Sequence, residues 1–170
     1  MITAIDILKK ATENVSQKLK RKIDFHHGHH LTITNHITEL QEKGKKQFPA
    51  VIVFTERMTE KRDKYWIEFS IPKVAICTLT KLNATEKQRL ESNFKTIIYP
   101  IFESFEKELQ KLHYGYDFAL NRTDIPYFVA ESNKPKAENA NTFNELVDGC
   151  IFPITKLKVM YEQCEIKLKV

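Results

Sequence analysis

The stretch Asn83–Leu112, NATEKQRLESNFKTIIYPIFESFEKELQKL, decides the fold class of this 170-residue chain. Its apolar residues recur at steps of three and four, which is the spacing of one face of an α-helix. That face is formed by Leu90, Phe94, Ile97, Ile101, Phe105, Leu109 and Leu112. Thr85 and Gln88 are spaced as a capping box, and Pro100 predicts a kink or interruption near the middle. We expect a long amphipathic helix that lies across a β-sheet.

Two apolar segments before this helix have the pattern of β-strands. Phe48–Thr55, FPAVIVFT, is a continuous apolar run, which is typical of a buried strand. Tyr65–Thr80, YWIEFSIPKVAICTLT, alternates at first and turns apolar on both faces after Pro72, so we expect a bulge or an edge position there. The segment between them, Glu56–Lys64 (ERMTEKRDK), is almost purely charged and predicts an exposed loop that joins the strands in a hairpin.

The N-terminal segment Ala4–Ile23 predicts a second amphipathic helix. Thr3 and Asp6 are spaced as a capping box, and apolar residues follow at near-helical intervals. The polar face of this helix is basic and carries Lys9, Lys10, Lys18, Lys20, Arg21 and Lys22. Positive charge near the C-terminal end of a helix suits the helix dipole, which is a sufficient structural reason for it; the same face is the candidate surface for nucleic acid.

The remaining segments complete an α+β pattern. Leu31–Lys43 is ambiguous, because its β-branched residues favour a strand and the spacing of its apolar residues favours a helix. Asp124–Ala130, Leu146–Tyr161 and Glu165–Val170 predict strands, with a turn or bulge at Asp148–Gly149. We expect a single domain over residues 1–170, with an antiparallel or mixed β-sheet on which the long helix and the N-terminal helix pack.

The histidine-rich segment Asp24–His30, DFHHGHH, predicts a polar turn around its glycine. Imidazoles are good ligands for zinc or nickel, and His26, His27, His29 and His30 form the one local cluster of that kind in the sequence. No cysteine lies nearby and no HExxH motif occurs. We therefore predict no metal and no cofactor, and whether these four histidines bind an ion stays open.

Motifs of catalysis are missing from the sequence. Neither GxSxG nor a glycine-rich phosphate loop can be written with the four glycines present. Cys77 lies in an apolar strand pattern, where a thiol is usually inert, and three widely spaced cysteines give no disulfide framework. We therefore do not expect an enzyme.

Charge and hydropathy narrow the class of protein further. The formal net charge is +5 and the pI is near 9.0, which is compatible with weak attraction to nucleic acid but is not the footprint of a dedicated DNA-binding domain. The longest apolar run, Phe48–Phe54, is too short to cross a bilayer. The N-terminus lacks the apolar core of a signal peptide, so we expect a protein that stays inside the cell that makes it.

The order of these segments resembles that of a known structural family. FPAVIVF, the charged segment, YWIEFSIPKVAICTLT, the helix with IIYPIFESFEKEL and the closing NELVDGCIFPITKLKV follow one another as in tail terminator and tail-completion proteins of tailed bacteriophages. The chain is also similar to uncharacterised prophage proteins of the Bacteroidetes type. The resemblance implies a subunit of a ring, typically hexameric, that caps the tail tube and joins it to the head, with no catalytic residues.

This resemblance also implies partners and a location. The partners would be other copies of the chain, the tail tube and head-completion proteins, with DNA as a further contact and no membrane. The location would be the virion, and the cytoplasm of the bacterial host during assembly. Another small neck component, such as a head-closure or connector protein, is nearly as good an interpretation. A nucleic-acid-binding accessory protein that uses the basic N-terminal helix is the alternative from a different class.

Two polar segments are the candidate arms of such a ring subunit. They are Glu56–Lys64 and Ser132–Glu145, which are long and polar for a compact domain. A ring closes through two different surfaces on each protomer, and the mixed charges of these arms suit pairing between neighbours. The candidate interface residues are Glu56, Arg57, Glu60, Lys61, Arg62, Asp63, Lys134, Lys136 and Glu138.

Overall fold

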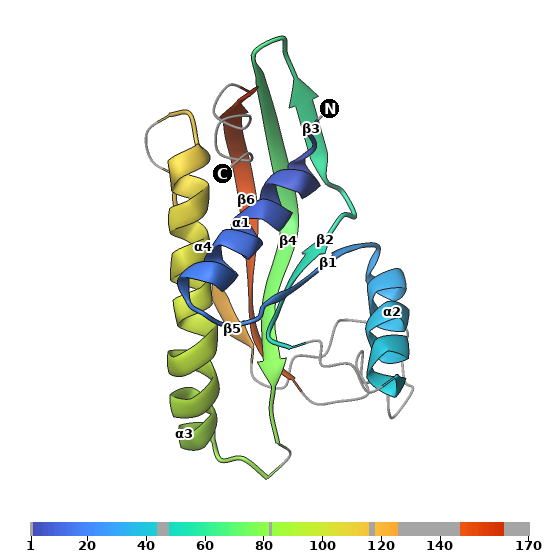
Figure 1. Cartoon of the computed structure of the whole chain (residues 1–170), viewed down its shortest axis with the longest axis vertical. Coiled ribbons are helices and arrows are strands. Elements are labelled where there is room, and N and C mark those ends of the chain that lie inside the picture. The colour runs from blue at the N-terminus through green and yellow to red at the C-terminus, as the bar shows by residue number, and fades with distance from the viewer. Residues whose placement is uncertain (1, 44–47, 82, 116–117, 126–146, 162–170) are drawn as a thin grey trace.

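The computed structural model of the chain describes residues 2–43, 48–81, 83–115, 118–125 and 147–161 (Figure 1). The helices are α1 (Ala4–Lys18), α2 (His30–Glu42), α3 (Glu86–Arg89), the π-helix η1 (Leu90–Ile98) and α4 (Tyr99–Leu112). The strands are β1 (Asp24–Gly28), β2 (Ala50–Phe54), β3 (Thr59–Arg62), β4 (Trp66–Leu79), β5 (Thr123–Ile125) and β6 (Val147–Met160). The predicted α+β class is confirmed.

The sheet is mixed, as expected. Its strand order is β1-β2-β4-β6-β5, and β3 pairs with β4 in addition. Only β1 and β2 are parallel among the described strands, since every other pair is antiparallel. β2 pairs with Lys73–Cys77 and β3 with Ile67–Ser70, so β3 continues the line of β2 along the same side of β4.

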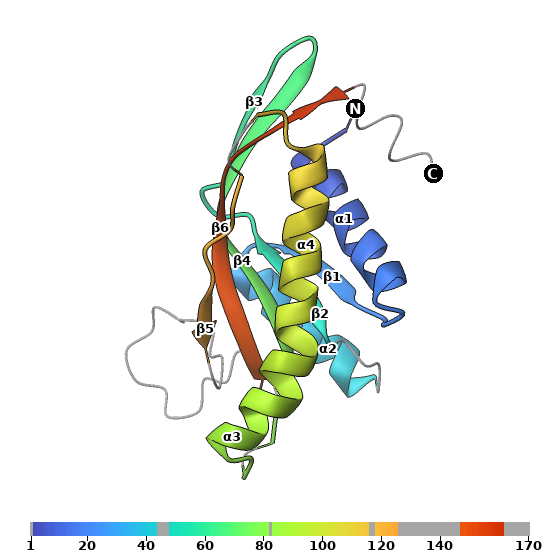
Figure 2. The same cartoon turned by 90° about the vertical axis from the view of Figure 1, so that its left-hand side faces the viewer.

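Helices cover the two faces of the sheet at different places. Side chains alternate along a strand, and in β2 the odd residues Val51 and Val53 belong to the core under α1 and α4. The even residue Ile52 belongs to a second cluster, which contains Ile33 and Ile37 of α2. Figure 2 shows α1 and α4 side by side on one face of the sheet. α2 therefore packs on the opposite face.

α1 begins as predicted and ends earlier. The Thr3 hydroxyl accepts from the Asp6 backbone N–H, and the Asp6 carboxylate accepts from the Thr3 backbone N–H, so the capping box is confirmed. The helix ends at Lys18 instead of Ile23, because Lys20 has a φ of 48° in the left-handed region and Ile23 leads into β1. The segment after the helix is thus a tight connection to the edge of the sheet.

The predicted long helix is continuous, but its middle is a π-helix. The capping box of Thr85 and Gln88 is confirmed. From Leu90 to Ile98 the backbone bonds run from residue i to i+5, as in the bond from the Tyr99 N–H to the Phe94 carbonyl. Pro100 is the second residue of α4, and it has no N–H to donate to the carbonyls of η1. The predicted interruption at the proline is therefore a change of helix type.

Most of the apolar face that the sequence predicts for the long helix is buried, but its first residue is not. Ile98 and Ile101 are fully buried, whereas Leu90 is 38% exposed. The predicted core position of Leu90 is wrong, because Leu90 lines the open pocket near the start of the long helix. Phe94 remains buried, four residues after Leu90.

The strands around Pro72 and Gly149 differ in how they accommodate these residues. The register between β4 and β6 shifts between Phe69 and Ile71 and again between Ile71 and Val74, so the predicted bulge near Pro72 is confirmed. β6 runs straight through Asp148–Gly149, where a turn or bulge was expected. Position 149 instead requires glycine because β4 and β6 lie close together there. A Cβ on Gly149 would lie 2.9 Å from the Ile76 carbonyl oxygen.

Three further expectations are corrected or resolved. Asp24–His30 is not a polar turn, because its first five residues form β1 beside β2. The ambiguous Leu31–Lys43 lies almost wholly in α2. Glu56–Lys64 is not simply a loop, because its centre is β3.

Ser132–Glu145 and Glu165–Val170 lie outside the described residues. None of the helices in the described part of the chain has the length and apolar character needed to cross a membrane.

Candidate functional site

One end of the sheet projects beyond the helices as a three-stranded ribbon (Figures 1 and 2). This ribbon consists of β3, the Trp66–Ser70 part of β4 and the Leu157–Met160 part of β6. The inner face of the ribbon carries core residues such as Ile67 and Val159. α2 lies at the other end of the sheet, so no described helix covers the outer face of the ribbon, which carries charged residues such as Glu68 and apolar ones such as Trp66.

β3 is the edge of this ribbon. It pairs with β4 on one side, and no described strand pairs with its other side. An open strand edge presents backbone N–H and C=O groups that another chain can pair with, and charged side chains normally restrain such pairing. The exposed Lys61 and Arg62 of β3 are charges of that kind. The free edge of β3 is therefore suited to a partner strand that carries charges opposite to those of Lys61 and Arg62.

The predicted interface residues of the charged segment divide into two groups. Arg57, Lys61 and Asp63 are exposed. Glu60 is engaged internally, because its carboxylate accepts from the Ala4 backbone N–H at 3.4 Å and forms an ion pair with Arg62. The remaining three candidates, Lys134, Lys136 and Glu138, lie outside the described residues.

The outer face of the ribbon combines aligned charges with aromatic rings. Lys61, Glu68 and Lys158 lie in register across β3, β4 and β6. The Lys158 ammonium lies 4.3 Å from the centre of the Trp66 ring, within the range of a cation–π contact. Tyr65, at the tip, is 58% exposed. Exposed aromatic rings of this kind are enriched at protein interfaces.

Glu56, also predicted as an interface residue, instead contacts the histidine-rich segment. Its Oε1 accepts from the His30 backbone N–H at 2.6 Å and lies 2.8 Å from His30 Nδ1 and 3.7 Å from His29 Nε2. The parallel pairing of β1 and β2 ends in a bond from the Thr55 N–H to the Gly28 carbonyl, which places both strand ends together. Gly28, at a φ of 139°, turns the chain from β1 toward α2.

The environment of Glu56 favours its charged form on balance. Burial acts to raise the pKa of this carboxyl, but the backbone and side-chain hydrogen bonds from His30 and the proximity of His29 outweigh it and leave the pKa lowered. The carboxylate is therefore ionised at neutral pH. A carboxylate at the N-terminal end of α2 also stabilises that helix, because it accepts a free backbone N–H and interacts with the helix dipole.

His26 has a different environment from its neighbours. It is 8% exposed, it lies between β1 and α2, and its ring is 6.0 Å from that of His36. Burial lowers the pKa of His26 to about 4, against an opposing effect of Asp24. The imidazole therefore stays neutral at physiological pH and serves as part of the core. His27, by contrast, is exposed on β1.

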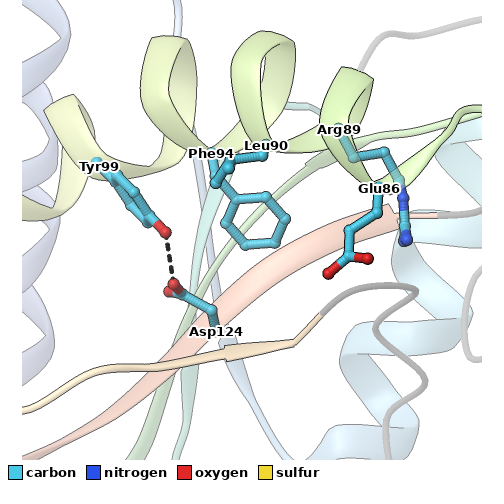
Figure 3. Close-up of a pocket in the computed structure, with 6 residues that line it drawn as sticks. All are labelled: Glu86, Arg89, Leu90, Phe94, Tyr99 and Asp124. Carbon is cyan, nitrogen blue, oxygen red and sulfur yellow. Dashed lines mark hydrogen bonds between the residues drawn. The ribbon is translucent and has the colours of Figure 1, made fainter.

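A pocket of about 170 Å³ lies between the long helix and β5 (Figure 3). It is lined by Glu86, Arg89, Leu90, Phe94, Tyr99 and Asp124. The Tyr99 hydroxyl points at Asp124 and donates a hydrogen bond of 2.6 Å to its carboxylate (Figure 3). Burial and this hydrogen bond raise the pKa of Tyr99, so the phenol remains a proton donor. The Arg122 guanidinium covers the Tyr99 ring at 3.9 Å.

A buried polar network ties the start of the long helix to β6. Asp148 is fully buried in β6, and its carboxylate accepts a 2.7 Å hydrogen bond from Asn93 and lies 3.5 Å from the Arg89 guanidinium. Asn93 also donates to the Leu79 carbonyl. The sequence signal for this network is an aspartate inside an apolar strand, which requires partners because burial of an unpaired charge is costly.

The basic face of α1 is smaller than the sequence indicates. Lys18 and Lys20 are exposed. Lys22 forms an ion pair with Asp24 at 3.1 Å, and Arg21 donates to the Thr96 carbonyl oxygen at 3.1 Å. Part of the predicted nucleic-acid surface therefore has contacts within the protein.

The described cysteines are buried in the sheet. Cys77 and Cys150 are both fully buried free thiols. Burial raises the pKa of Cys77 far above its usual range and that of Cys150 to about 12. The thiolate form that would be needed for nucleophilic chemistry is therefore negligible at either position at neutral pH.

Besides the polar surface of the ribbon, the Glu56–histidine cluster and the pocket beside β5, the described residues line a second, open pocket of about 730 Å³ between the end of β4 and the start of the long helix. Comparison of the chain with protein-family models, with curated proteins and with solved structures gave no match.

Proposed function

We propose that this chain is a ring-forming structural subunit at the tail terminus or head–tail neck of a tailed phage or prophage particle. The observation that carries the proposal is the ribbon, which projects from the body and ends in an open, charged strand edge. The resemblance of the segment order to tail terminator proteins supports the same assignment. The ribbon would contact the next subunit of the ring, and the tail tube and head-completion proteins would contact the ring.

A head-to-tail ring suits the asymmetry of this protomer. Ring closure through rotation requires two different surfaces, one on each side of the subunit. The ribbon lies at one end of the protein and is distinct from the helical body (Figure 1). In the proposed ring, the ribbon of one subunit packs against the body of the next subunit.

The side chains of the ribbon have separable roles in this contact. The aligned charges of Lys61, Glu68 and Lys158 would set the register between neighbours more than the affinity. Exposed aromatic side chains contribute more of the binding free energy at an interface. Tyr65 at the tip is therefore the residue with the largest expected effect on assembly.

Assembly on tail tubes tests the proposal. A monomer in free solution is compatible with the proposal, because a subunit of this kind can need the tail tube in order to assemble. Wild-type protein mixed with tail tubes of the source phage should form rings at tube ends in negative-stain images, and the protein should be present in purified virions. Absence from virions together with absence of rings would contradict the proposal.

Two variants and one control locate the interface on the ribbon. Tyr65→Ala and Lys61→Glu should reduce ring formation, because they remove the tip contact and reverse one register charge. Lys107→Glu reverses an exposed charge on α4 and should assemble like the wild type. Equal assembly of all three variants would place the interface away from the ribbon.

A further inference from the structure

The cluster of His29, His30 and Glu56 has the composition of a transition-metal site. Each residue offers one ligand atom, and the three atoms all lie within 4.8 Å of one another. The cluster is assembled from two places in the chain, the start of α2 and the turn after β2. We propose that His29, His30 and Glu56 bind one divalent transition-metal ion, with Zn²⁺ as the preferred ion.

The spacing of the ligand atoms is close to that of a tetrahedral zinc site. Zinc–nitrogen and zinc–oxygen bonds of roughly 2.0–2.2 Å hold ligand atoms roughly 3.3–3.6 Å apart in a tetrahedron. Glu56 Oε1 lies 3.7 Å from His29 Nε2 and 2.8 Å from His30 Nδ1. The first distance must shorten slightly and the second lengthen by less than about 1 Å, and the two imidazole nitrogens, which lie within 4.8 Å of each other, must approach by up to about 1.5 Å.

The donor set selects the class of ion. Two imidazoles and one carboxylate suit Zn²⁺, Ni²⁺ or Co²⁺, whereas Ca²⁺ and Mg²⁺ prefer oxygen ligands. Three protein ligands leave the fourth tetrahedral position for water. The exposures of the side chains, 54% for His29, 33% for His30 and 31% for Glu56, leave a path for the ion from solvent.

A second observation concerns the other carboxylate oxygen of Glu56. Its Oε2 is buried and has no hydrogen-bond partner among the described residues. Capping of α2 explains the position of Oε1, but it leaves Oε2 buried without compensation. A cation bound by the same carboxylate would offset part of the cost of burying this oxygen.

Two existing contacts must give way to the proposed ion. The stronger is the hydrogen bond of 2.8 Å between His30 Nδ1 and Glu56 Oε1, which bonds from both atoms to the metal would replace, with the His30 ring proton on Nε2. The second contact is weaker. The Leu31 backbone N–H donates to His29 Nδ1 at 3.4 Å, so Nδ1 accepts and Nε2 carries the proton in the metal-free protein. Ligation through Nε2 moves the ring proton to Nδ1 and breaks this contact. The contact is long for a hydrogen bond, and its loss is small beside the formation of a metal–imidazole bond.

A bound ion would brace the base of the ribbon. Glu56 precedes the turn that leads into β3, whereas His29 and His30 join β1 to α2. Metal ligation would therefore cross-link the β1–α2 junction to the connection between β2 and β3. This role does not depend on ring assembly, so its test uses the isolated protein.

The test is titration of untagged, chelator-treated protein with Zn²⁺, followed by calorimetry and by thermal unfolding. The protein should carry Cys164→Ser, so that this thiol cannot supply a ligand. We expect one ion per chain and a higher melting temperature with Zn²⁺ than with chelator. Co²⁺ should bind at the same stoichiometry and give visible absorption bands.

Matched variants separate the site from adventitious binding to surface histidines. His29→Ala and Glu56→Gln should each weaken Zn²⁺ binding by at least about tenfold, since even loss of an outer-shell partner costs that much. Glu56→Gln keeps a carbonyl oxygen for the His30 N–H and so preserves the helix cap. His27→Ala removes an exposed histidine outside the cluster and should bind like the parent. Substoichiometric binding, or equal binding by all three variants, would overturn the proposal.

Discussion

The guanidinium of Arg21 donates a hydrogen bond of 3.1 Å to the carbonyl oxygen of Thr96, across 75 residues of sequence. In an α-helix this carbonyl would accept from the N–H of the residue four positions later. That residue is Pro100, which has no N–H. Thr96 lies in η1, so its carbonyl has no α-helical donor at Pro100, and the Arg21 side chain supplies a donor to it near the junction between η1 and α4.

This contact predicts a small, specific loss of stability on truncation. Arg21→Ala should lower the free energy of unfolding by about 0.5–1.5 kcal/mol, because the lost hydrogen bond is partly exposed and water can replace the donor. Lys20→Ala, which removes a neighbouring exposed cation, should change stability by less than about 0.5 kcal/mol. Urea denaturation measures both, and equal effects would contradict the assigned role of Arg21.

The exposure of Leu90 predicts unequal costs of truncation at two positions of the same predicted stripe. Ile101→Ala should destabilise by about 2–5 kcal/mol, because it opens a cavity in the core. Leu90→Ala should cost less than about 1.5 kcal/mol, since this side chain is 38% exposed. Ile101→Asp should unfold the domain or sharply lower its melting temperature. A stable, soluble Ile101→Asp protein would contradict the placement of α4 on the sheet.

The buried His26 predicts a loss of stability in mild acid. Its folded-state pKa of about 4 lies below the unfolded value near 6.5. Between these values the unfolded chain binds a proton that the folded chain does not, so stability falls as the pH drops through this window. The full effect is about 3 kcal/mol. Stability present above pH 6.5 is thus progressively lost toward pH 4.

Chemical denaturation at pH 7 and pH 4.5 checks this dependence. His26→Leu should show a smaller difference between the two pH values than the wild type, because leucine cannot be protonated. His27→Leu, at an exposed position, should retain the wild-type difference. The carboxyls of Asp6 and Glu56, whose pKa values are lowered, contribute stability that is lost as the pH falls further; they are common to all three proteins and cancel in the comparison.

The close approach of β4 and β6 predicts that Gly149 tolerates no side chain. A Cβ would lie 2.9 Å from the Ile76 carbonyl oxygen and 3.0 Å from the Cys77 sulfur. Because the nearest atom is backbone in the centre of the sheet, Gly149→Ala should cost about 1–3 kcal/mol. Thr155→Ala, at an exposed position of the same strand, is the control. An unchanged melting temperature for Gly149→Ala would show that the two strands can separate.

Salt dependence separates the ring subunit from the nucleic-acid-binding alternative. The alternative requires affinity that falls steeply with salt and that is lost when Lys18 and Lys20 are replaced, because phosphate contacts release counterions. We expect only weak, non-specific binding, above about a micromolar dissociation constant at physiological salt. Fluorescence anisotropy with a labelled duplex measures both. Submicromolar binding that depends on these lysines would favour the alternative.

Features that depend on a few neighbouring residues could be predicted from the sequence. Both capping boxes join residues three positions apart, Thr3 with Asp6 and Thr85 with Gln88. The bulge near Pro72 follows from a missing N–H within a strand. Each of these rests on local backbone chemistry, which the surrounding fold does not alter.

The errors arose where distant partners decide the local structure. Asp24–Gly28 lacks alternating apolar residues, and it becomes a strand because its backbone pairs with β2. The ambiguous segment becomes α2 because Ile33 and Ile37, four residues apart, pack on the second face of the sheet. The contact between His30 and Glu56 joins residues 26 positions apart. No spacing rule brings such residues together before the order of the strands is known.

The register between β4 and β6 has a consequence for synthesis of the protein. Leu79 pairs with Val147 and Trp66 with Met160, so the helices α3, η1 and α4 and the strand β5 lie within the loop that this pairing closes. Because long-range pairing is slow and exposes open strand edges before it forms, the nascent chain cannot complete its sheet until β6 has left the ribosome. The fold can therefore be completed only after Met160 has emerged from the ribosome, and shortened translation products would present the edge of β4 that pairs with β6 to other chains.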